Sequence, residues 1–244
     1  MNVHSAPASP AVVNDVFVSP PSTTFHTSVS VYSSPADGAA AGGDWCEVVP
    51  ISEHAVAMVV GDVAGHGAPV AGLMAAMRES VMRACHTTRV PSDVLAIVNG
   101  VAVMPAGGGA LVTAIVAVLD HRRNTLTFAN AGHPPPLLLT ADSHAFLQQS
   151  TADLPLGVFA KHSAANYVVA LPPNALLVLY TDGITEHDRN PILGEAELVD
   201  AARLMYGRPE PNVARAIAQL VFARGRGRDD AATIALRTMP RHPR

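Results

Sequence analysis

The fold is decided by residues 44–67, which read DWCEVVPISEHAVAMVVGDVAGHG. Two runs of apolar and β-branched residues, typical of β-strands, flank a short polar turn around Glu53. If the chain reverses at Glu53, Asp44 and Asp62 lie opposite each other, because both are nine residues from that turn. The segment therefore predicts an antiparallel hairpin that ends in two facing carboxylates.

Facing carboxylates destabilise a protein unless a cation lies between them. Residues directly opposite each other on neighbouring strands have Cβ atoms roughly 5 Å apart. At about 4 Å and an effective dielectric constant of about 20, two like charges repel by on the order of 4 kcal/mol. A divalent ion converts that repulsion into binding energy. Because the cysteines and histidines lack metal-ligand spacing here, the carboxylate oxygens favour magnesium or manganese over zinc.

Two further acidic positions follow predicted strands, at Asp182 beside Gly183 and at the pair Asp229 and Asp230. A single aspartate beside a glycine is usually a turn residue whose carboxylate accepts backbone N–H groups. Four strand-end acids, two of them predicted to face each other, equally fit a shared metal site. From the residues alone, both interpretations stay open.

Composition restricts the classes of protein that this chain can represent. Of the 244 residues, 49% are hydrophobic and 15% are charged, so the chain can bury a sizeable core and general disorder is excluded. The net charge of -4 argues against a nucleic-acid partner, since phosphate backbones are held by basic surfaces. No stretch is apolar over a membrane-spanning length and no signal peptide precedes the domain, so we expect a cytoplasmic protein without a membrane partner. The two cysteines, Cys46 and Cys85, are expected to be reduced thiols.

The remaining chain predicts alternating pairs of strands and helices. Residues 1–25, rich in proline and serine, are expected to form an extended or flexible arm, and residues 26–240 a single domain. Strands are expected at Thr27–Tyr32, Trp45–Ser52, His54–Val63, Ala110–Leu119, Thr125–Ala131, Pro136–Leu139, Tyr167–Leu171, Ala175–Tyr180 and Ala232–Arg237. Helices are expected at Ala68–His86, Ser92–Met104 with Ser92 as N-cap, Glu195–Met205 and Pro211–Ala223. This order predicts an α+β domain with mainly antiparallel sheets flanked by helices.

Six motifs in a fixed order give the chain a family resemblance. They are Ala41–Trp45, Gly61–Gly67, Phe128–Pro134, Leu154–Val158, Leu179–Glu186 and Asp229–Asp230. As a set they resemble the metal-dependent protein serine/threonine phosphatases of type 2C, in the bacterial branch named after the sporulation stage II protein E. The resemblance covers residues 28–237, nearly the whole chain.

The resemblance implies a central antiparallel β-sandwich flanked by helices on both faces, with two divalent ions, Mn²⁺ or Mg²⁺, at one end. By motif, Asp62 would bridge both ions, and the backbone carbonyl of Val63 would bind one of them. Asp182 and Asp229 would complete the other site, and Asp44 would bind a metal or orient metal-bound waters. Water between the ions would attack phosphorus, so no protein nucleophile is needed.

Three further residues of the family motifs are assigned roles other than metal binding. His66 would either protonate the leaving serine or threonine oxygen or cap the loop that begins the following helix, and both roles stay open. Asn130 and His133 belong to a family motif as well, and we expect them to pack their loop.

The implied function is hydrolysis of phosphoserine or phosphothreonine on a regulatory protein. In this branch the partner is an anti-anti-sigma factor in a partner-switching circuit, and the helices from Ala68 to Met104 would act as a regulatory lever. The alternatives are a catalytically weak or inactive binding module of the same fold in a signalling complex, and a two-metal hydrolase of small phosphoesters. All four acids are present, which favours an active enzyme, whereas no phosphate-gripping arginine precedes Arg78. The sequence leaves the oligomeric state open.

Overall fold

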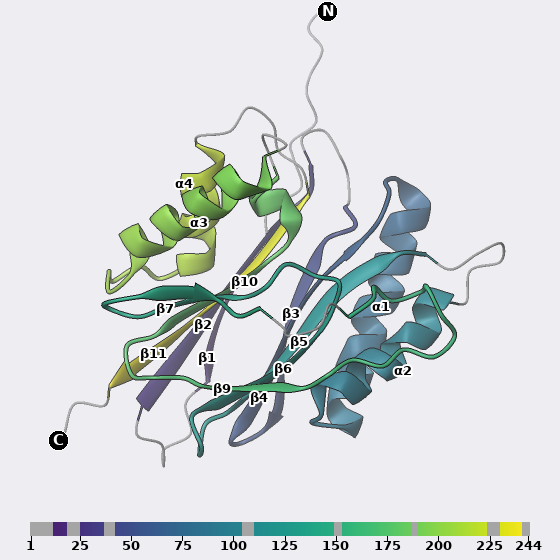
Figure 1. Ribbon diagram of the computed structural model, residues 1–244, viewed down its shortest axis with the longest axis horizontal. Coiled ribbons are helices and arrows are strands. Elements are labelled where there is room, and N and C mark those ends of the chain that lie inside the picture. The colour runs from purple at the N-terminus through teal and green to yellow at the C-terminus, as the bar shows by residue number, and fades with distance from the viewer. Residues whose placement is uncertain are drawn as a thin grey trace, which may run out of the picture.

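Two antiparallel β-sheets pack face to face, and each carries a pair of helices on its outer face (Figure 1). The computed structural model describes residues 12–18, 25–36, 42–103, 110–148, 153–186, 190–223 and 230–240. The helices are α1 (Ala68–Thr87), α2 (Pro91–Val103), α3 (Pro191–Met205) and α4 (Val213–Phe222). The predicted α+β class, with a central antiparallel sandwich and helices on both faces, is confirmed.

The eleven strands of the described residues are divided between a five-stranded and a six-stranded sheet. The five-stranded sheet has the order β3-β4-β5-β6-β9, and α1 and α2 cover it. Its strands are β3 (Trp45–Ser52), β4 (Ala55–Val63), β5 (Val112–Asp120), β6 (Thr125–Ala131) and β9 (Tyr167–Ala170). The six-stranded sheet has the order β1-β2-β11-β10-β7-β8, and α3 and α4 cover it. Its strands are β1 (Val12–Val18), β2 (Phe25–Ser34), β7 (Leu137–Leu139), β8 (His144–Phe146), β10 (Leu176–Tyr180) and β11 (Ala231–Pro240).

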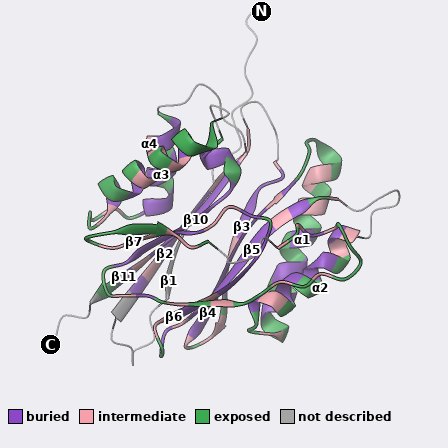
Figure 2. Cartoon of the chain, viewed as in Figure 1, coloured by how far each residue is buried: buried purple, intermediate pink, exposed green. Residues whose placement is uncertain are grey.

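Strand β4 shows why the central strands are apolar without alternation. Val56, Met58 and Val60 pack in the cluster between the two sheets. Ala57 and Val59 point the other way, into the cluster beneath α1 and α2. Both faces of the strand are therefore covered, and Figure 2 shows β4 and its neighbour β5 mostly in the colour of buried residues. Such a strand has no solvent face on which polar residues would be favoured.

The β3–β4 hairpin has the register that the sequence predicted. Trp45 pairs with Gly61 and Cys46 with Val60, so every pair up to Pro50 is equally distant from the turn at Glu53. A register shift after Pro50 accommodates the turn itself. Asp44 directly precedes this ladder, and Asp62 directly follows Gly61.

The helix boundaries differ from prediction at the start of α3, which begins at Pro191 rather than at Glu195, and at the start of α2. Ser92 was expected to be the N-cap, but the helix begins at Pro91 and the expectation is wrong. Proline is favoured at the first helical position because its fixed φ suits the helix and its missing N–H would have had no helical partner. Ser92 instead lies inside the first turn, where its Oγ accepts a hydrogen bond from Asn166 Nδ2 at 2.7 Å. Met104, its expected end, lies outside the described residues.

Two strands were not predicted. Strand β1 falls within the expected N-terminal arm and pairs with β2 from Val12↔Ser33 to Val18↔Thr27, at one edge of the six-stranded sheet. Strand β8 has three residues and pairs with β7 at the other edge. Strand β8 is too short for a sequence-based prediction, and the seven residues of β1 lack the strict alternation of apolar and polar residues on which one depends.

The expectations about cysteines and membrane helices can be compared with the structure. Cys46 and Cys85 are free and buried, as predicted. Burial raises the pKa of the Cys85 thiol to about 11 and that of Cys46 to about 12, so both remain protonated at neutral pH. Among the described residues, none of the helices combines the length and the hydropathy needed to cross a bilayer.

Candidate functional site

Three of the four predicted acids, Asp44, Asp62 and Asp182, lie at one end of the sandwich. Asp62 lies on β4 of the five-stranded sheet and pairs with Thr113 of β5. Asp182 begins a short 3₁₀ helix (Asp182–Ile184) directly after β10 of the six-stranded sheet. Asp44 comes from the segment that leads into β3. The two sheets and one connecting segment thus each deliver a carboxylate to this end.

The environment of Asp44 shows that these carboxylates act on one another. Asp44 is only 8% exposed, and burial is the largest influence that raises the pKa of its carboxyl group. The charge of Asp62 and a hydrogen bond with its side chain raise this pKa further, as does the charge of Asp182. A hydrogen bond from Thr181 opposes them. Two carboxyl groups share a hydrogen bond only when one holds a proton, so this pair requires either a proton or a cation.

The described carboxylates do not form a closed ligand shell. Within the described residues, no group of three or more His, Cys, Asp or Glu side chains is placed so that it could hold an ion. Asp44 and Asp62 are within hydrogen-bonding reach of each other, whereas Asp182 acts on Asp44 through its charge. Asp229, the fourth predicted ligand, lies outside the described residues. The structure thus brings together two of the four acids, with the third nearby.

Glycines at the start of the site allow the backbone to approach these acids closely. A Cβ atom on Gly43 would lie 2.5 Å from the carbonyl oxygen of Val63 and 3.2 Å from Oδ1 of Asp62. The N–H of Val63 donates to the carbonyl of Gly43 at 3.3 Å. Only glycine leaves this space open, which explains the Gly-Gly-Asp sequence before β3. The Val63 carbonyl therefore lies beside the predicted acids.

Asp230 has a role that sequence reasoning missed. Its Oδ1 accepts the N–H of Ala36 at 2.6 Å, and its Oδ2 accepts the N–H of Gly43 at 2.7 Å. A Cβ on Gly42 would lie 2.2 Å from the Asp230 carboxyl group, so this contact also depends on glycine. Asp230 thereby fixes the backbone next to Asp44. The only signal in the sequence was the adjacent Asp-Asp pair, which does not show which carboxylate faces the backbone.

His133 joins the two sheets next to the acids. Its ring contacts Thr113 Oγ1 through Nδ1 at 2.9 Å and the carbonyl of Tyr180 through Nε2 at 3.0 Å. Thr113 is the strand partner of Asp62, and Tyr180 ends the strand that precedes Asp182. Because a carbonyl only accepts, Nε2 carries the proton and Nδ1 accepts from the threonine hydroxyl. The ring therefore links the strand beside Asp62 to the strand before Asp182.

The loop around His133 is held by its own hydrogen bonds. Asn130 Oδ1 accepts the N–H of His133 at 2.7 Å, and Asn130 Nδ2 donates to the His133 carbonyl at 2.7 Å. The expected loop-packing role of both residues is confirmed. Burial lowers the pKa of His133 to about 3, so the ring is neutral at physiological pH.

His66 lies on the surface, four residues after Asp62 in the chain. The residue is exposed, in the segment between β4 and α1. The N-cap of α1 is Gly67, and His66 makes no hydrogen bond to the start of the helix within the described residues. Of its two expected roles, capping the helix therefore has no supporting contact, and proton transfer stays a prediction.

The chain matches the family model described as "Stage II sporulation protein E" over residues 52–239. Among curated proteins it is similar to phosphoserine phosphatase RsbU of Bacillus subtilis, with 26% identity over 144 residues, which is 59% of this chain and 43% of RsbU. The chain spans less than half the length of the curated relatives reported to match it.

Solved structures resemble the chain over nearly its whole length. The RsbU and RsbW domains of Rv1364c from Mycobacterium tuberculosis match with a TM-score of 0.77 and 25% identity, covering 94% of this chain and 65% of that one. RsbX in complex with magnesium matches with a TM-score of 0.67 and 14% identity, covering 93% of this chain and 99% of that one. At these identities the second match shows the fold alone.

Replacing Asp44 by asparagine tests the charge balance of the site. The folded-state pKa of Asp44 is raised, so its contribution to stability is present below its unfolded pKa of about 4 and is lost as pH rises through the folded value. Asparagine mimics the neutral acid at every pH. We expect Asp44→Asn to raise the free energy of unfolding at pH 8, in chelator, by on the order of 1–3 kcal/mol.

Urea unfolding at pH 5 and pH 8 measures this effect, and the gain should shrink at the lower pH. Asp142→Asn, which removes an exposed carboxylate, is the matched control and should change little. A loss of stability in Asp44→Asn at pH 8 would contradict the electrostatic account of the site.

Replacing His133 by alanine tests the link between the sheets. The variant leaves Thr113 and the Tyr180 carbonyl without these partners, so we expect a loss of about 2–4 kcal/mol at pH 7. The folded pKa of His133 lies far below the unfolded value of about 6.5, so its stabilisation is present above pH 6.5 and declines as pH falls toward 3. The stability difference between wild type and variant should therefore narrow between pH 7 and pH 4. A stability difference that stays constant over this range would refute the role of His133 as a neutral, hydrogen-bonded link between the sheets. An equal loss of stability in the exposed control His86→Ala would refute it as well.

Proposed function

The chain belongs to the stage II sporulation protein E family, and from that premise we propose that it is a metal-dependent protein serine/threonine phosphatase. The single observation that carries the proposal is the buried Asp44 carboxyl, which lies against Asp62 and within the electrostatic influence of Asp182. Burying one carboxylate beside two others is unfavourable by itself, and this cost is compensated when a divalent cation binds there.

The donor set fits a hard divalent ion. Oδ2 of Asp44 is buried and has no hydrogen-bond partner among the described residues, so it offers an acceptor to a ligand. Asp62, Asp182, Asp229 and the Val63 carbonyl would supply the remaining protein oxygens. All are oxygen donors, which suits Mn²⁺ or Mg²⁺, and the similarly folded RsbX was solved with magnesium. When bound, two such ions lower the pKa of water and neutralise charge that develops on the phosphoryl oxygens.

The chain's own residues keep these donors in place. The Thr181 side chain bonds to Asp44, and its Oγ1 also accepts the N–H of Ala232 at 2.9 Å, which limits its rotation. Asp230 holds the backbone before Asp44, and His133 links the strands that lead to Asp62 and Asp182. His66, which is exposed and follows Asp62 by four residues, is the group that we assign to protonate the leaving serine or threonine oxygen.

The substrate that we infer is a phosphorylated regulatory protein. RsbU, to which the chain is similar, is a phosphoserine phosphatase, and the family resemblance in the sequence implies an anti-anti-sigma factor within a partner-switching circuit. Asp182 is exposed and Asp62 is half-buried at this end of the sandwich, so a phosphoserine on a folded protein can reach the acids from the Asp182 side. The alternative, an inactive binding module, would bind such a partner without releasing phosphate.

Hydrolysis of an aryl phosphate and of a phosphoserine peptide tests the proposal. Wild type should release phosphate only with Mn²⁺ or Mg²⁺, and Asp182→Asn should lower kcat by about 100-fold or more, because it removes a predicted ligand. Asp142→Asn, an exposed aspartate far from the acids in sequence, is the matched control and should keep full activity. Equal rates with and without chelator would reject metal-dependent hydrolysis. Binding of the peptide without turnover by wild type would instead favour the inactive module.

A further inference from the structure

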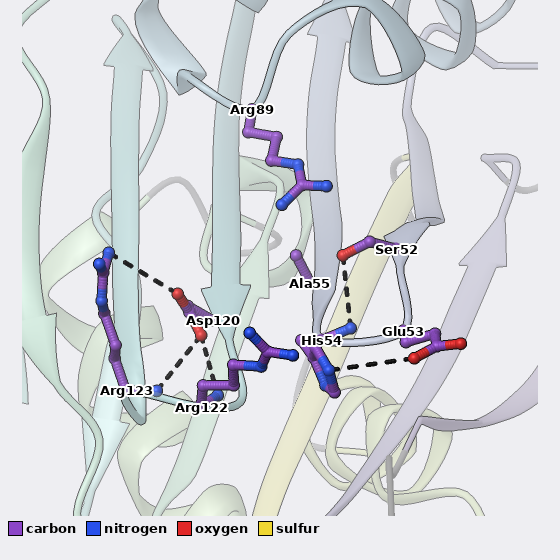
Figure 3. A pocket seen from close by; sticks show the side chains of 8 residues that line it. All are labelled: Ser52, Glu53, His54, Ala55, Arg89, Asp120, Arg122 and Arg123. Carbon is purple, nitrogen blue, oxygen red and sulfur yellow. Dashed lines mark hydrogen bonds and ion pairs between the residues drawn. The ribbon is translucent and has the colours of Figure 1, made fainter.

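A pocket bordered mainly by polar and charged residues lies at the end of the five-stranded sheet opposite to the acids. It has a volume of about 550 Å³ and is bordered by the β3–β4 turn, the β5–β6 turn and the connection between α1 and α2 (Figure 3). Its lining residues are Ser52, Glu53, His54, Ala55, Arg89, Asp120, Arg122 and Arg123. Volumes of this size are typical of sites for small molecules.

This pocket is separate from the acidic site. Strand β4 begins at Ala55, which lines the pocket, and carries Asp62 near its other end. At about 3.3 Å per residue, the two positions are roughly 23 Å apart along the strand. A ligand in the pocket therefore does not touch the acids.

The pocket contains positive charge that the protein does not neutralise. The side chains of Arg89 and Arg122 have no hydrogen bond or ion pair within the described part of the chain, although both line the pocket. In Figure 3, Arg89 extends from the α1–α2 connection toward Ala55, and Arg122 extends from the β5–β6 turn toward His54. Their head groups thus approach the same space from two sides.

The acidic residues of the pocket are engaged elsewhere. Asp120 Oδ1 accepts the backbone N–H groups of Arg122 at 2.8 Å and Arg123 at 3.2 Å, and Oδ2 lies 3.9 Å from Arg123 Nη1. Asp120 is therefore a turn residue, and the Arg123 guanidinium is the one that it neutralises. The Glu53 side chain is 90% exposed, and its nearest basic atom is His54 Nε2 at 4.0 Å. Neither carboxylate balances Arg89 or Arg122.

We propose that this pocket binds the phosphoryl group of a small phosphate monoester between Arg89 and Arg122. Guanidinium groups present planar pairs of N–H donors that match phosphate oxygens, and they are weakly hydrated, so they release water readily to an anion. His54 adds a further polar atom, because its Nδ1 is buried without a partner among the described residues. The pocket is much larger than a phosphate ion, so the alcohol part of a monoester fits beside the phosphoryl group. This binding does not depend on the proposed phosphatase activity.

Titration calorimetry of the full chain tests this site. The protein is kept in chelator at constant ionic strength with chloride, and O-phosphoserine, a nucleoside monophosphate and inorganic phosphate are titrated separately. Wild type should show saturable binding of at least one monoester, and Arg89→Gln/Arg122→Gln should weaken it at least tenfold. The matched control, Arg83→Gln/Arg203→Gln, removes the same charge from exposed positions on α1 and α3 and should bind like wild type.

The outcomes separate this site from the acidic one. Asp182→Asn should keep the affinity of wild type, because the pocket does not use the acids. Tighter binding of a monoester than of inorganic phosphate supports a ligand with an organic part. Comparing the affinities of O-phosphoserine and the nucleoside monophosphate shows whether that part is an amino acid or a nucleoside. Equal affinities in the two double-arginine variants, or no saturable binding of any of the three ligands by wild type, would overturn the proposal. Circular dichroism establishes that each variant is folded.

Discussion

The contact between the carboxyl groups of Asp44 and Asp62 is the constraint on which the rest of this end of the molecule depends. The hairpin register places the two residues beyond its last pair, Trp45 with Gly61, and burial of Asp44 limits the screening of the contact by water. In water such a contact would separate at little cost. Here the backbone prevents separation, because Gly43 lies against Val63 and Asp230 holds the N–H of Gly43. The protein thus maintains a site that is favourable only with a proton or a cation present.

Because Asp62 and Asp182 belong to different sheets, the geometry of the site depends on how the sheets are joined. Apolar packing between sheets is non-directional and permits small sliding motions, whereas hydrogen bonds do not. His133 supplies two such bonds at the relevant end, one to each sheet. On the face of β3 that α1 covers, Arg78 of α1 donates to Glu47 through Nε at 2.6 Å. This hydrogen bond couples the helix to the strand that follows Asp44. This contact ties α1 to β3 three residues from Asp44, and the lever role expected of the helix pair stays a prediction.

Much of this arrangement could be predicted from the sequence, because long apolar strands and a hairpin symmetric about Glu53 are local patterns. The family motifs then placed Asp182 with Asp44 and Asp62. Other features depend on contacts that a local pattern does not encode. Strands β1 and β8 lie at the edges of the six-stranded sheet, and the contacts of Asp230 join it to Ala36 and Gly43, which are far from it in the chain. The pocket around Arg89 is assembled from three turns that are distant in the chain.

The central claim is that Asp44, Asp62 and Asp182 form a site for divalent cations, and anomalous diffraction from crystals soaked in Mn²⁺ tests it most directly. The account predicts manganese peaks at this end of the sandwich, with carboxylate oxygens of Asp44 and Asp62 within about 2.5 Å of a peak or of the waters around it. It also predicts that Asp182 moves to contact the metal. Crystals that diffract well but show no peak near these residues, or peaks only elsewhere, would contradict it.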